Sequence, residues 1–292
     1  MPEISSPPAP QAPRWDTVAI LGVGLIGGSI GIDLLRRGLA RNVVGIGRRE
    51  ERLHVARKAG ACTTTTLDVP QGVADAELII VCTPVGRIAA DVREAAGVAK
   101  TNALITDVGS TKETIVSELD RDLPREAHFV GSHPLAGGER AGPAAAVAGL
   151  FERRTVVVTP GTATRDEDVQ SITTFWQSLG ANVVRMTPAE HDRLIAGASH
   201  LPHLAAAALV SATPRESLPL VAGGWVDATR IAAGDAELWR DIFMTNRTNV
   251  LAALDRYEEA LAKFRQALAG DDAAALVAAL QEAKRTRDAV GN

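Results

Sequence analysis

The sequence contains little that would point to a secreted or nucleic-acid-binding protein. It has 292 residues but only two cysteines, Cys62 and Cys82, both in apolar or strand-like surroundings. Two such thiols are best interpreted as buried and reduced, which fits a cytosolic protein and gives no disulfide framework. The net charge is −4, so the chain shows no electrostatic footprint for nucleic acid.

Export and membrane signals are also missing. No apolar run approaches the ~18–20 residues that a bilayer-spanning helix needs. The N-terminal segment MPEISSPPAPQAPR has neither a basic region nor an apolar core, so it is not a secretory signal. Its many prolines predict a disordered tail over residues 1–14. We therefore expect a cytoplasmic protein with neither a membrane nor a nucleic-acid partner.

Strand-like and helix-like segments alternate from Trp15 to about residue 187. Short apolar runs predict strands, and the segments between them predict helices. The strand-like runs cover 17–21, 42–47, 76–84, 103–109, 128–134, 154–160 and 182–188. The run AELIIVCTP (76–84) is continuously apolar, as is typical of a parallel strand buried on both faces. The order predicts an α/β fold with a Rossmann-type, doubly wound parallel sheet over 15–187.

The pattern changes at Thr187. The run Thr-Pro-Ala-Glu (187–190) is a capping box with proline at the first helical position, and no strand-like run follows it. Helices are expected over 188–211, 224–232, 235–268 and 271–289, with breaks at Pro202, Pro214, Pro219, Gly223-Gly224 and Gly270. We therefore expect an all-helical C-terminal domain over 188–292.

This helical half carries more apolar side chains than an elongated domain of roughly 105 residues is expected to bury alone. They stand at helical spacing and include Val250, Leu251, Leu261, Phe264, Leu268, Leu276 and Leu280. The pattern predicts a homodimer formed through this domain.

A glycine motif, GVGLIG (22–27), follows the first strand and opens the first helix. In this setting Gly22 permits the tight turn, Gly24 lets the backbone approach a pyrophosphate, and Gly27 lets the helix pack close to the strand. The plain alternative is a glycine turn without a nucleotide. The expected cofactor contacts are Gly22, Gly24, Leu25, Ile26, Gly27 and, after the 76–84 strand, Thr83 and Pro84.

The end of the second strand predicts which dinucleotide is bound. NAD enzymes place an acid there for the ribose 2′-hydroxyl, but here Gly47 takes that position and Arg48 and Arg49 follow. Guanidinium groups can bind a 2′-phosphate in a bidentate manner. We therefore expect a preference for NADP, with NAD still possible; the alternative is two solvated arginines at a helix start.

Two loops at the carboxyl ends of later strands carry reactive side chains. DVGSTK (107–112) ends one strand, and SHPLAGGER (132–140) ends the next. Because ligands of such sheets bind outside the carboxyl ends of the strands, Ser110 and His133 are expected to face the nicotinamide together. A hydroxyl beside a histidine can orient the ring and set its tautomer.

Together the motifs resemble the prephenate/arogenate dehydrogenases of tyrosine biosynthesis, from Trp15 to the C-terminus. The resemblance rests on GVGLIGGS (22–29), DVGSTK (107–112), SHPLAGGER (132–140), SHLPH (199–203), DATRIA (227–232) and WRDI (239–242). Their order makes the signal specific, whereas any single motif would be weak.

The resemblance implies oxidative decarboxylation of prephenate to 4-hydroxyphenylpyruvate, or of arogenate to tyrosine. A hydride passes from ring C4 to NAD(P)+. His133 would accept the hydrogen bond of the 4-hydroxyl, and Ser110 would position His133 and the substrate. Arg230 would hold a carboxylate. The remaining substrate contacts would be His203, His200, Glu139 and Trp239. A homodimer is also implied.

Each assignment has a plainer alternative. His133 would otherwise be a loop histidine bonded to backbone, and Arg230 an exposed helix arginine. His200 and His203 share a helical face and suggest a metal pair, but no third ligand is evident, so no metal is expected. Trp239 fits core or dimer packing equally well, and Glu139 fits a solvated loop.

The chain departs from the family at Gly138, where many members carry a hydroxyl residue before the glutamate. Two rival functions stay open. A β-hydroxyacid dehydrogenase would use a lysine in the helical domain, where only Lys263 and Lys284 occur, without a glycine-rich context. A non-catalytic NADP sensor would keep the glycine motif but would not need Ser110, His133 and Arg230 together.

Overall fold

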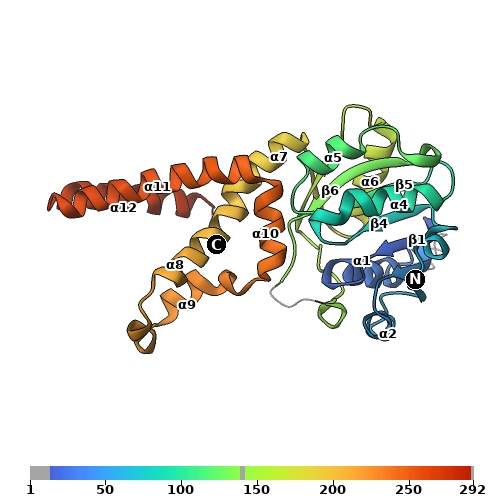
Figure 1. Cartoon of the computed structure of the whole chain (residues 1–292), viewed down its shortest axis with the longest axis horizontal. Coiled ribbons are helices and arrows are strands. Elements are labelled where there is room, and N and C mark those ends of the chain that lie inside the picture. The colour runs from blue at the N-terminus through green and yellow to red at the C-terminus, as the bar shows by residue number, and fades with distance from the viewer. Residues whose placement is uncertain (1–13, 139–141, 291–292) are drawn as a thin grey trace, which may run out of the picture.

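The computed structural model describes residues 14–138 and 142–290. Its first half is one eight-stranded sheet in the order β3-β2-β1-β4-β5-β6-β7-β8, and its second half is helical. Figure 1 shows the sheet and its covering helices at one end of the molecule, with the α11–α12 hairpin projecting away from it. The expected tail 1–14 lies outside the described residues except for Arg14, whose guanidinium lies over the Trp15 ring.

The sheet is doubly wound, as predicted. Its strands are β1 (Trp15–Leu21), β2 (Ala40–Ile46), β3 (Thr64–Thr66), β4 (Leu78–Val81), β5 (Leu104–Asp107), β6 (His128–Pro134), β7 (Thr155–Thr159) and β8 (Asn182–Arg185). The helices of this half are α1 (Leu25–Arg36), α2 (Glu50–Lys58), α3 (Val69–Val73), α4 (Ile88–Val98), α5 (Glu113–Leu119) and α6 (Asp166–Ser178). The strand order reverses between β1 and β4, which creates the crevice where such folds bind dinucleotides.

One strand pair departs from the predicted all-parallel sheet. β7 runs antiparallel to β6, with Gly131 opposite Thr159 and His133 opposite Val157. A parallel return needs a long crossover, usually a helix. In the described part of the β6–β7 connection the only helical element is a short 3-10 turn, Pro143–Ala145. The chain therefore returns beside β6 in the opposite direction.

Two apolar cores cover the two faces of the sheet. One packs Phe151, Phe175 and Trp176 against β1, β6 and β7, and the other packs α3, α4 and α5 against the opposite face. The helical half adds only a small buried cluster around Ala196, Val250 and Ala253. The α/β half is thus the rigid support of the molecule, and the helical half keeps much apolar surface exposed.

The helical half contains α7 (Pro188–Ile195), α8 (Leu201–Ala212), α9 (Gly223–Thr229), α10 (Ala236–Thr245), α11 (Arg247–Ala269) and α12 (Ala273–Val290). The predicted cap at Thr187 is present, because its hydroxyl accepts a hydrogen bond from Glu190 N at 3.2 Å. The expected break at Pro202 is absent. A π-helical turn over Ala196–His200 instead joins α7 to α8. The wider turn accommodates a proline that lacks an N–H and crowds the preceding turn.

The helix expected over 235–268 is two helices, α10 and α11, separated at Asn246. Its backbone leaves helical geometry at φ −114° and ψ 29°. Its buried side chain donates to the Asp192 carbonyl at 2.7 Å. No glycine or proline marks the break, so a tertiary hydrogen bond determines it.

The joined helix 188–212 is long and apolar enough to cross a membrane by length and composition, with a mean hydropathy of 1.4 over its most apolar window. The apolar run within it, LAAAALV (204–210), is much shorter than a bilayer span, which is why a search for long apolar runs does not find the helix. The helix carries the buried polar side chains His191, Asp192 and His200, each about 1% exposed. Those groups contact the α/β half or other helices rather than lipid.

Candidate active site

The glycine turn after β1 has the geometry that a dinucleotide requires. Gly22 has φ +92°, and a Cβ there would stand 2.6 Å from the Cys82 carbonyl oxygen. A Cβ on Gly27 would stand 2.4 Å from the Gly22 carbonyl oxygen, whereas nothing lies within 4 Å of a Cβ on Gly24. The turn is therefore closed toward the protein and open at Gly24, where a pyrophosphate could approach α1.

A cavity of about 530 Å³ opens beside this turn. It is lined by Gly22 and Gly24 from the turn, by Thr83 and Pro84 after β4, and by Arg48 and Arg49 after β2, as the sequence predicted. Leu25, Ile26 and Gly27 are the first residues of α1 behind it. The cavity therefore brings most of the predicted cofactor contacts together at the crevice between β1 and β4.

The structure adds a third arginine to this cavity, Arg52, in the first turn of α2. Like Arg48 and Arg49 it is exposed to solvent. The cavity's acids, Asp91 and Glu94, both come from α4, where Asp91 binds Arg87 at 2.9 Å. The β2 side of the cavity is thus cationic, which suits a phosphate on the adenosine ribose.

His133 lies at the carboxyl end of β6 and is 8% exposed. Its backbone is fixed by Ser132, whose hydroxyl donates to the Asp107 carbonyl at 2.6 Å and accepts from Trp176 Nε1 at 3.0 Å. Ser132 N also donates to Asp107 Oδ1 at 3.0 Å. The strand end that carries the histidine is therefore held by a buried polar network.

Lys112 completes this network beneath His133. Its side chain is fully buried, forms an ion pair with Asp107, and donates to the Ser132 carbonyl at 3.0 Å. Burial lowers the pKa of Lys112, while Asp107 opposes that shift. A buried pair of this kind is costly to break, so the two loops stay locked together.

The ring of His133 contacts the helical half rather than its own loop. Its Nδ1 lies 2.9 Å from Nε2 of His191 on α7, and the rings meet edge to face at 73°. His191 Nδ1 lies 2.7 Å from Asp192 Oδ1. Asp192 in turn accepts Lys112 N at 2.7 Å and Glu113 N at 3.0 Å. These contacts join the two halves of the chain at the candidate active site.

The environment keeps His133 neutral. Burial, followed by the nearby His191 ring and the Lys112 ammonium, holds the pKa of His133 well below its ordinary value of 6.5. Nε2 has no hydrogen-bond partner among the described residues. The ring can therefore present an unprotonated nitrogen to a bound hydroxyl near neutral pH.

Aromatic rings of the helical half gather around Trp239, and one of them, His200, also acts on the pKa of His133. His203 stacks on Trp239 with centroids 3.5 Å apart, and His200 meets Trp239 edge to face at 6.2 Å. Asn246 Nδ2 donates to His200 Nδ1 at 3.2 Å, which places the His200 hydrogen on Nε2. Burial lowers the pKa of His200 to about 4 and also lowers that of His203, so both rings are neutral.

The other predicted site residues, Ser110, Arg230 and Glu139, have no described hydrogen bond with His133. Ser110 is half-buried in the loop after β5, but among the described residues the partner of the His133 ring is His191, not Ser110. No hydrogen bond joins Ser110 to His133 among the described residues, and α7 supplies the nitrogen that contacts Nδ1. The expected role of Ser110 in positioning His133 stays a prediction. Arg230 is exposed at the start of a 3-10 turn, Arg230–Ala233, that packs on α8. Glu139 lies outside the described residues.

Three residues at the centre of the site were not predicted: His191, Asp192 and Lys112. His191 and Asp192 come directly after the capping box at Thr187, so their place at the domain boundary was a signal that could have been used. Lys112 ends the quoted motif DVGSTK, but nothing local distinguishes its buried role from that of a surface lysine.

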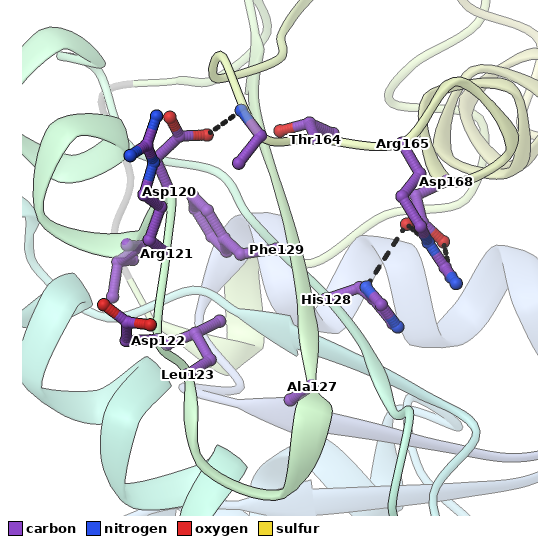
Figure 2. Close-up of a pocket in the computed structure, with 12 residues that line it drawn as sticks. Asp120, Arg121, Asp122, Leu123, Ala127, His128, Phe129, Thr164, Arg165 and Asp168 are labelled. Carbon is purple, nitrogen blue, oxygen red and sulfur yellow. Dashed lines mark hydrogen bonds and ion pairs between the residues drawn. The ribbon is translucent and has the colours of Figure 1, made fainter.

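A second hollow of about 320 Å³ lies at the other end of β6, between the end of α5 and the start of α6. Figure 2 shows two groups of polar side chains on opposite sides of the hollow, Asp120 and Arg121 on one and His128, Arg165 and Asp168 on the other. Arg165 binds Asp168 at 2.7 Å, His128 Nδ1 lies 3.5 Å from Asp168, and Asp120 accepts backbone N–H groups of the 162–163 loop. We assign it no ligand, because Asp120, His128, Arg165 and Asp168 are already paired with neighbours.

Neither lysine of the helical half supports the alternative function of a β-hydroxyacid dehydrogenase. Lys263 on α11 and Lys284 on α12 are both exposed, on the helical hairpin that projects from the rest of the molecule. Neither is buried among the aromatic rings of the site.

Comparison with known proteins places this arrangement in a family. Residues 30–185 match the family model described as the prephenate dehydrogenase nucleotide-binding domain, and residues 187–282 match the model described as its dimerization domain. A prephenate dehydrogenase of Bacillus subtilis is 37% identical over 94% of this chain and 76% of its own length.

Solved structures agree. Prephenate dehydrogenase from Aquifex aeolicus, in complex with hydroxyphenyl propionate and NAD+, superposes with a TM-score of 0.87 at 30% identity and covers 94% of this chain and 98% of its own. Synechocystis arogenate dehydrogenase gives a TM-score of 0.79 at 27% identity and covers 94% and 99%. The chain therefore belongs to the prephenate dehydrogenase family and is a nicotinamide-dependent oxidoreductase.

Proposed function

We propose that this chain oxidatively decarboxylates prephenate or arogenate, and that His133 is the hydrogen-bond acceptor for the ring 4-hydroxyl. The observation that carries the proposal is the position of His133. It lies at the carboxyl end of β6, on the same edge of the sheet as the glycine turn, with a neutral ring and an unpartnered Nε2. The names of the relatives supply the two substrates.

The reaction requires an acceptor for the hydrogen bond of the 4-hydroxyl, a cation that orients a substrate carboxylate, and a site that excludes water. When bound, the nicotinamide cofactor accepts the hydride that leaves ring C4 with its electron pair. His133 Nε2 accepts the hydroxyl hydrogen bond while that oxygen becomes carbonyl-like. The ring carboxylate then leaves as CO2, and its electron pair completes the aromatic ring, so the hydroxyl keeps its proton. Arg230 orients a carboxylate, and His200, His203 and Trp239 enclose the ring from the helical half.

The test supplies prephenate and arogenate side by side with NADP+ and follows absorbance of the reduced cofactor. We expect turnover with at least one substrate, and a fall in kcat of about 10²- to 10⁴-fold in His133→Asn, with cofactor binding retained. Absence of turnover with both substrates, from folded protein supplied with NADP+ and then with NAD+, would contradict the proposed substrates.

We further propose that the enzyme prefers NADP, bound by the cationic side of the cavity at Arg48, Arg49 and Arg52. Exchange of Arg48 and Arg49 for alanine should raise KM for NADP+ at least about tenfold and change KM for NAD+ little, because bidentate contacts to a phosphate are strong. Arg57→Ala, on α2 but outside the cavity, is the matched control. A wild-type kcat/KM that favours NAD+ contradicts the preference. The chain is further proposed to act as a cytoplasmic homodimer.

A further inference from the structure

We infer that Asp192, acting through His191, sets the tautomer of His133 and steadies the charge that develops on its ring. The inference rests on the role proposed for His133. It concerns three side chains in series, His133–His191–Asp192, referred to below as the relay. All three are buried, with exposed fractions of 8%, 1% and 1%.

The Asp192 carboxylate, at one end of the relay, can only accept hydrogen bonds. A backbone N–H can only donate, and Asp192 receives one on each oxygen, from Lys112 N to Oδ1 and from Glu113 N to Oδ2. Both oxygens are therefore acceptors. The hydrogen in the 2.7 Å contact between Asp192 Oδ1 and His191 Nδ1 must then lie on the nitrogen.

This assignment passes along the relay. In the proposed relay His191 carries this one hydrogen, on Nδ1, so its Nε2 keeps a lone pair. The 2.9 Å contact with His133 then requires a hydrogen on His133 Nδ1. His133 Nε2 is left as the lone-pair nitrogen, which is the tautomer that can accept a bond from a substrate hydroxyl. A loop histidine without the relay would have no fixed tautomer.

The relay also meets the electrostatic need of the reaction. Partial positive charge develops on His133 while the hydride leaves, and Lys112 already places a buried cation nearby. Asp192 supplies the opposite charge through a path of two hydrogen bonds, and no proton has to leave the site. The surroundings of His133 disfavour a charged ring in the resting enzyme. When positive charge develops on the ring during the reaction, the negative charge of Asp192 offsets it.

Asp192 is also fixed from the helical side. Asn246, at the break between α10 and α11, donates to the Asp192 carbonyl at 2.7 Å. The relay therefore spans the boundary between the two halves, with His133 on β6 and the other two members on α7. His191 and Asp192 are positioning residues, because they act through His133.

Asp192→Asn gives the main test. The amide cannot accept from Lys112 N and Glu113 N together, as the carboxylate does, so its NH2 group must replace one oxygen. Facing His191 Nδ1, the NH2 group reverses the order of donors along the relay and moves the protonated nitrogen of His133 from Nδ1 to Nε2. Facing Glu113 N, it keeps the tautomer but removes the negative charge. In both cases we expect kcat to fall about 100-fold or more, with KM for cofactor within a few-fold. In ¹⁵N NMR of histidine-labelled protein, the protonated nitrogen of His133 distinguishes the two cases.

The matched control is Asp120→Asn. Asp120 also accepts two backbone N–H groups, from Thr162 at 2.9 Å and Ala163 at 3.0 Å, but it lies in the hollow at the other end of β6. Its exchange should leave kcat and the His133 tautomer unchanged. Any shared loss of stability will appear in both variants as a lower Tm.

A second pair of variants keeps the inference testable if Asp192→Asn does not fold. A glutamine at position 191 can accept from His133 with its oxygen and donate to Asp192 with its amide, whereas a leucine can do neither. We expect His191→Gln to retain the Nδ1-protonated tautomer and at least tenfold more kcat than His191→Leu. Equal kcat in the two variants would overturn the relay.

The outcomes separate the two proposals. If His133→Asn keeps its kcat, the role of His133 fails and the relay fails with it. If His133→Asn is inactive but Asp192→Asn retains kcat and the original tautomer, the proposed function stands and only the relay is overturned.

Discussion

At the scale of single residues, the properties of His133 come from neighbours distant in the chain. Its ordinary pKa is moved downward by burial, by His191 and by Lys112. A histidine on a loop and a histidine in a catalytic site have the same sequence signature, so this environment distinguishes them.

The first prediction concerns the pH dependence of turnover. The acceptor must be unprotonated, so activity is lost when pH falls through the folded-state pKa of His133, which lies below 6.5. We expect the acidic limb of kcat/KM to have its midpoint clearly below pH 6.5 and to be absent from the residual activity of His133→Asn. A limb centred at or above 6.5 would contradict a desolvated, neutral acceptor.

The second prediction concerns Gly138, where the chain departs from many relatives. Among the described residues a Cβ at this position would have only Leu25 Cδ2 within 4 Å, at 3.8 Å, so a serine fits without displacing these neighbours. We expect Gly138→Ser to lower KM for prephenate or arogenate several-fold, since a hydroxyl adds a polar contact, with Tm unchanged. Gly137→Ser, in equally open space, is the control and should leave KM unchanged.

At the scale of elements, the turn that opens α1 shows how local sequence builds a binding site. Neighbouring atoms leave no room for a Cβ at Gly22 and Gly27, whereas the space beside Gly24 is open, as the spacing of the three glycines predicted. Two features of the helical half were not predictable in this way. The break at Asn246 was not expected and coincides with a tertiary hydrogen bond, whereas the break expected at Pro202 is replaced by a wider π-helical turn.

The third prediction uses this turn. Gly22→Ala combines a left-handed φ with a clash against the Cys82 carbonyl, so it should raise the Kd for NADP+ at least about tenfold and lower stability by about 1–3 kcal/mol. Gly38→Ala is matched, with φ +65° and nothing within 4 Å of its Cβ. Calorimetric titration should show normal cofactor binding in Gly38→Ala; equally weak binding in both would rule out a local effect at the turn.

At the scale of the whole molecule, the helical half cannot bury its own apolar surface. Leu261 and Leu268 share one face of α11 at 50% and 67% exposed, and Val277 and Leu280 on α12 are 50% and 54% exposed. Phe264 is half-buried, so it packs partly within its own chain. The family model over 187–282 carries the description of a dimerization domain, which agrees with this exposed surface.

The fourth prediction follows from that surface. Leu268→Asp should shift the mass measured by light scattering from dimer toward monomer, because burial of a charge without a partner opposes association. Val55→Asp, on an exposed face of α2 and 38% exposed, should leave the dimer intact. An unchanged dimer in Leu268→Asp would show that α11 does not form the interface. Leu268 is preferred to Phe264 because its exchange disturbs fewer contacts within the chain.

Much of the architecture was determined by the sequence alone. Apolar runs, glycine turns and the Thr187 cap act over a few residues, so they predicted the doubly wound sheet, the cofactor turn and the change to helices. They also placed His133 at the carboxyl end of a strand, since that position depends only on where the strand stops.

The tertiary structure decided what His133 touches. Its partner His191 is 58 residues away in the chain, and Asp192 is held by Lys112 from 80 residues away. The antiparallel pairing of β6 with β7 was likewise decided by how the chain returns. Local patterns specify which backbone conformation each segment adopts, whereas a histidine's tautomer and pKa depend on charges and hydrogen bonds that only folding brings within 3 Å.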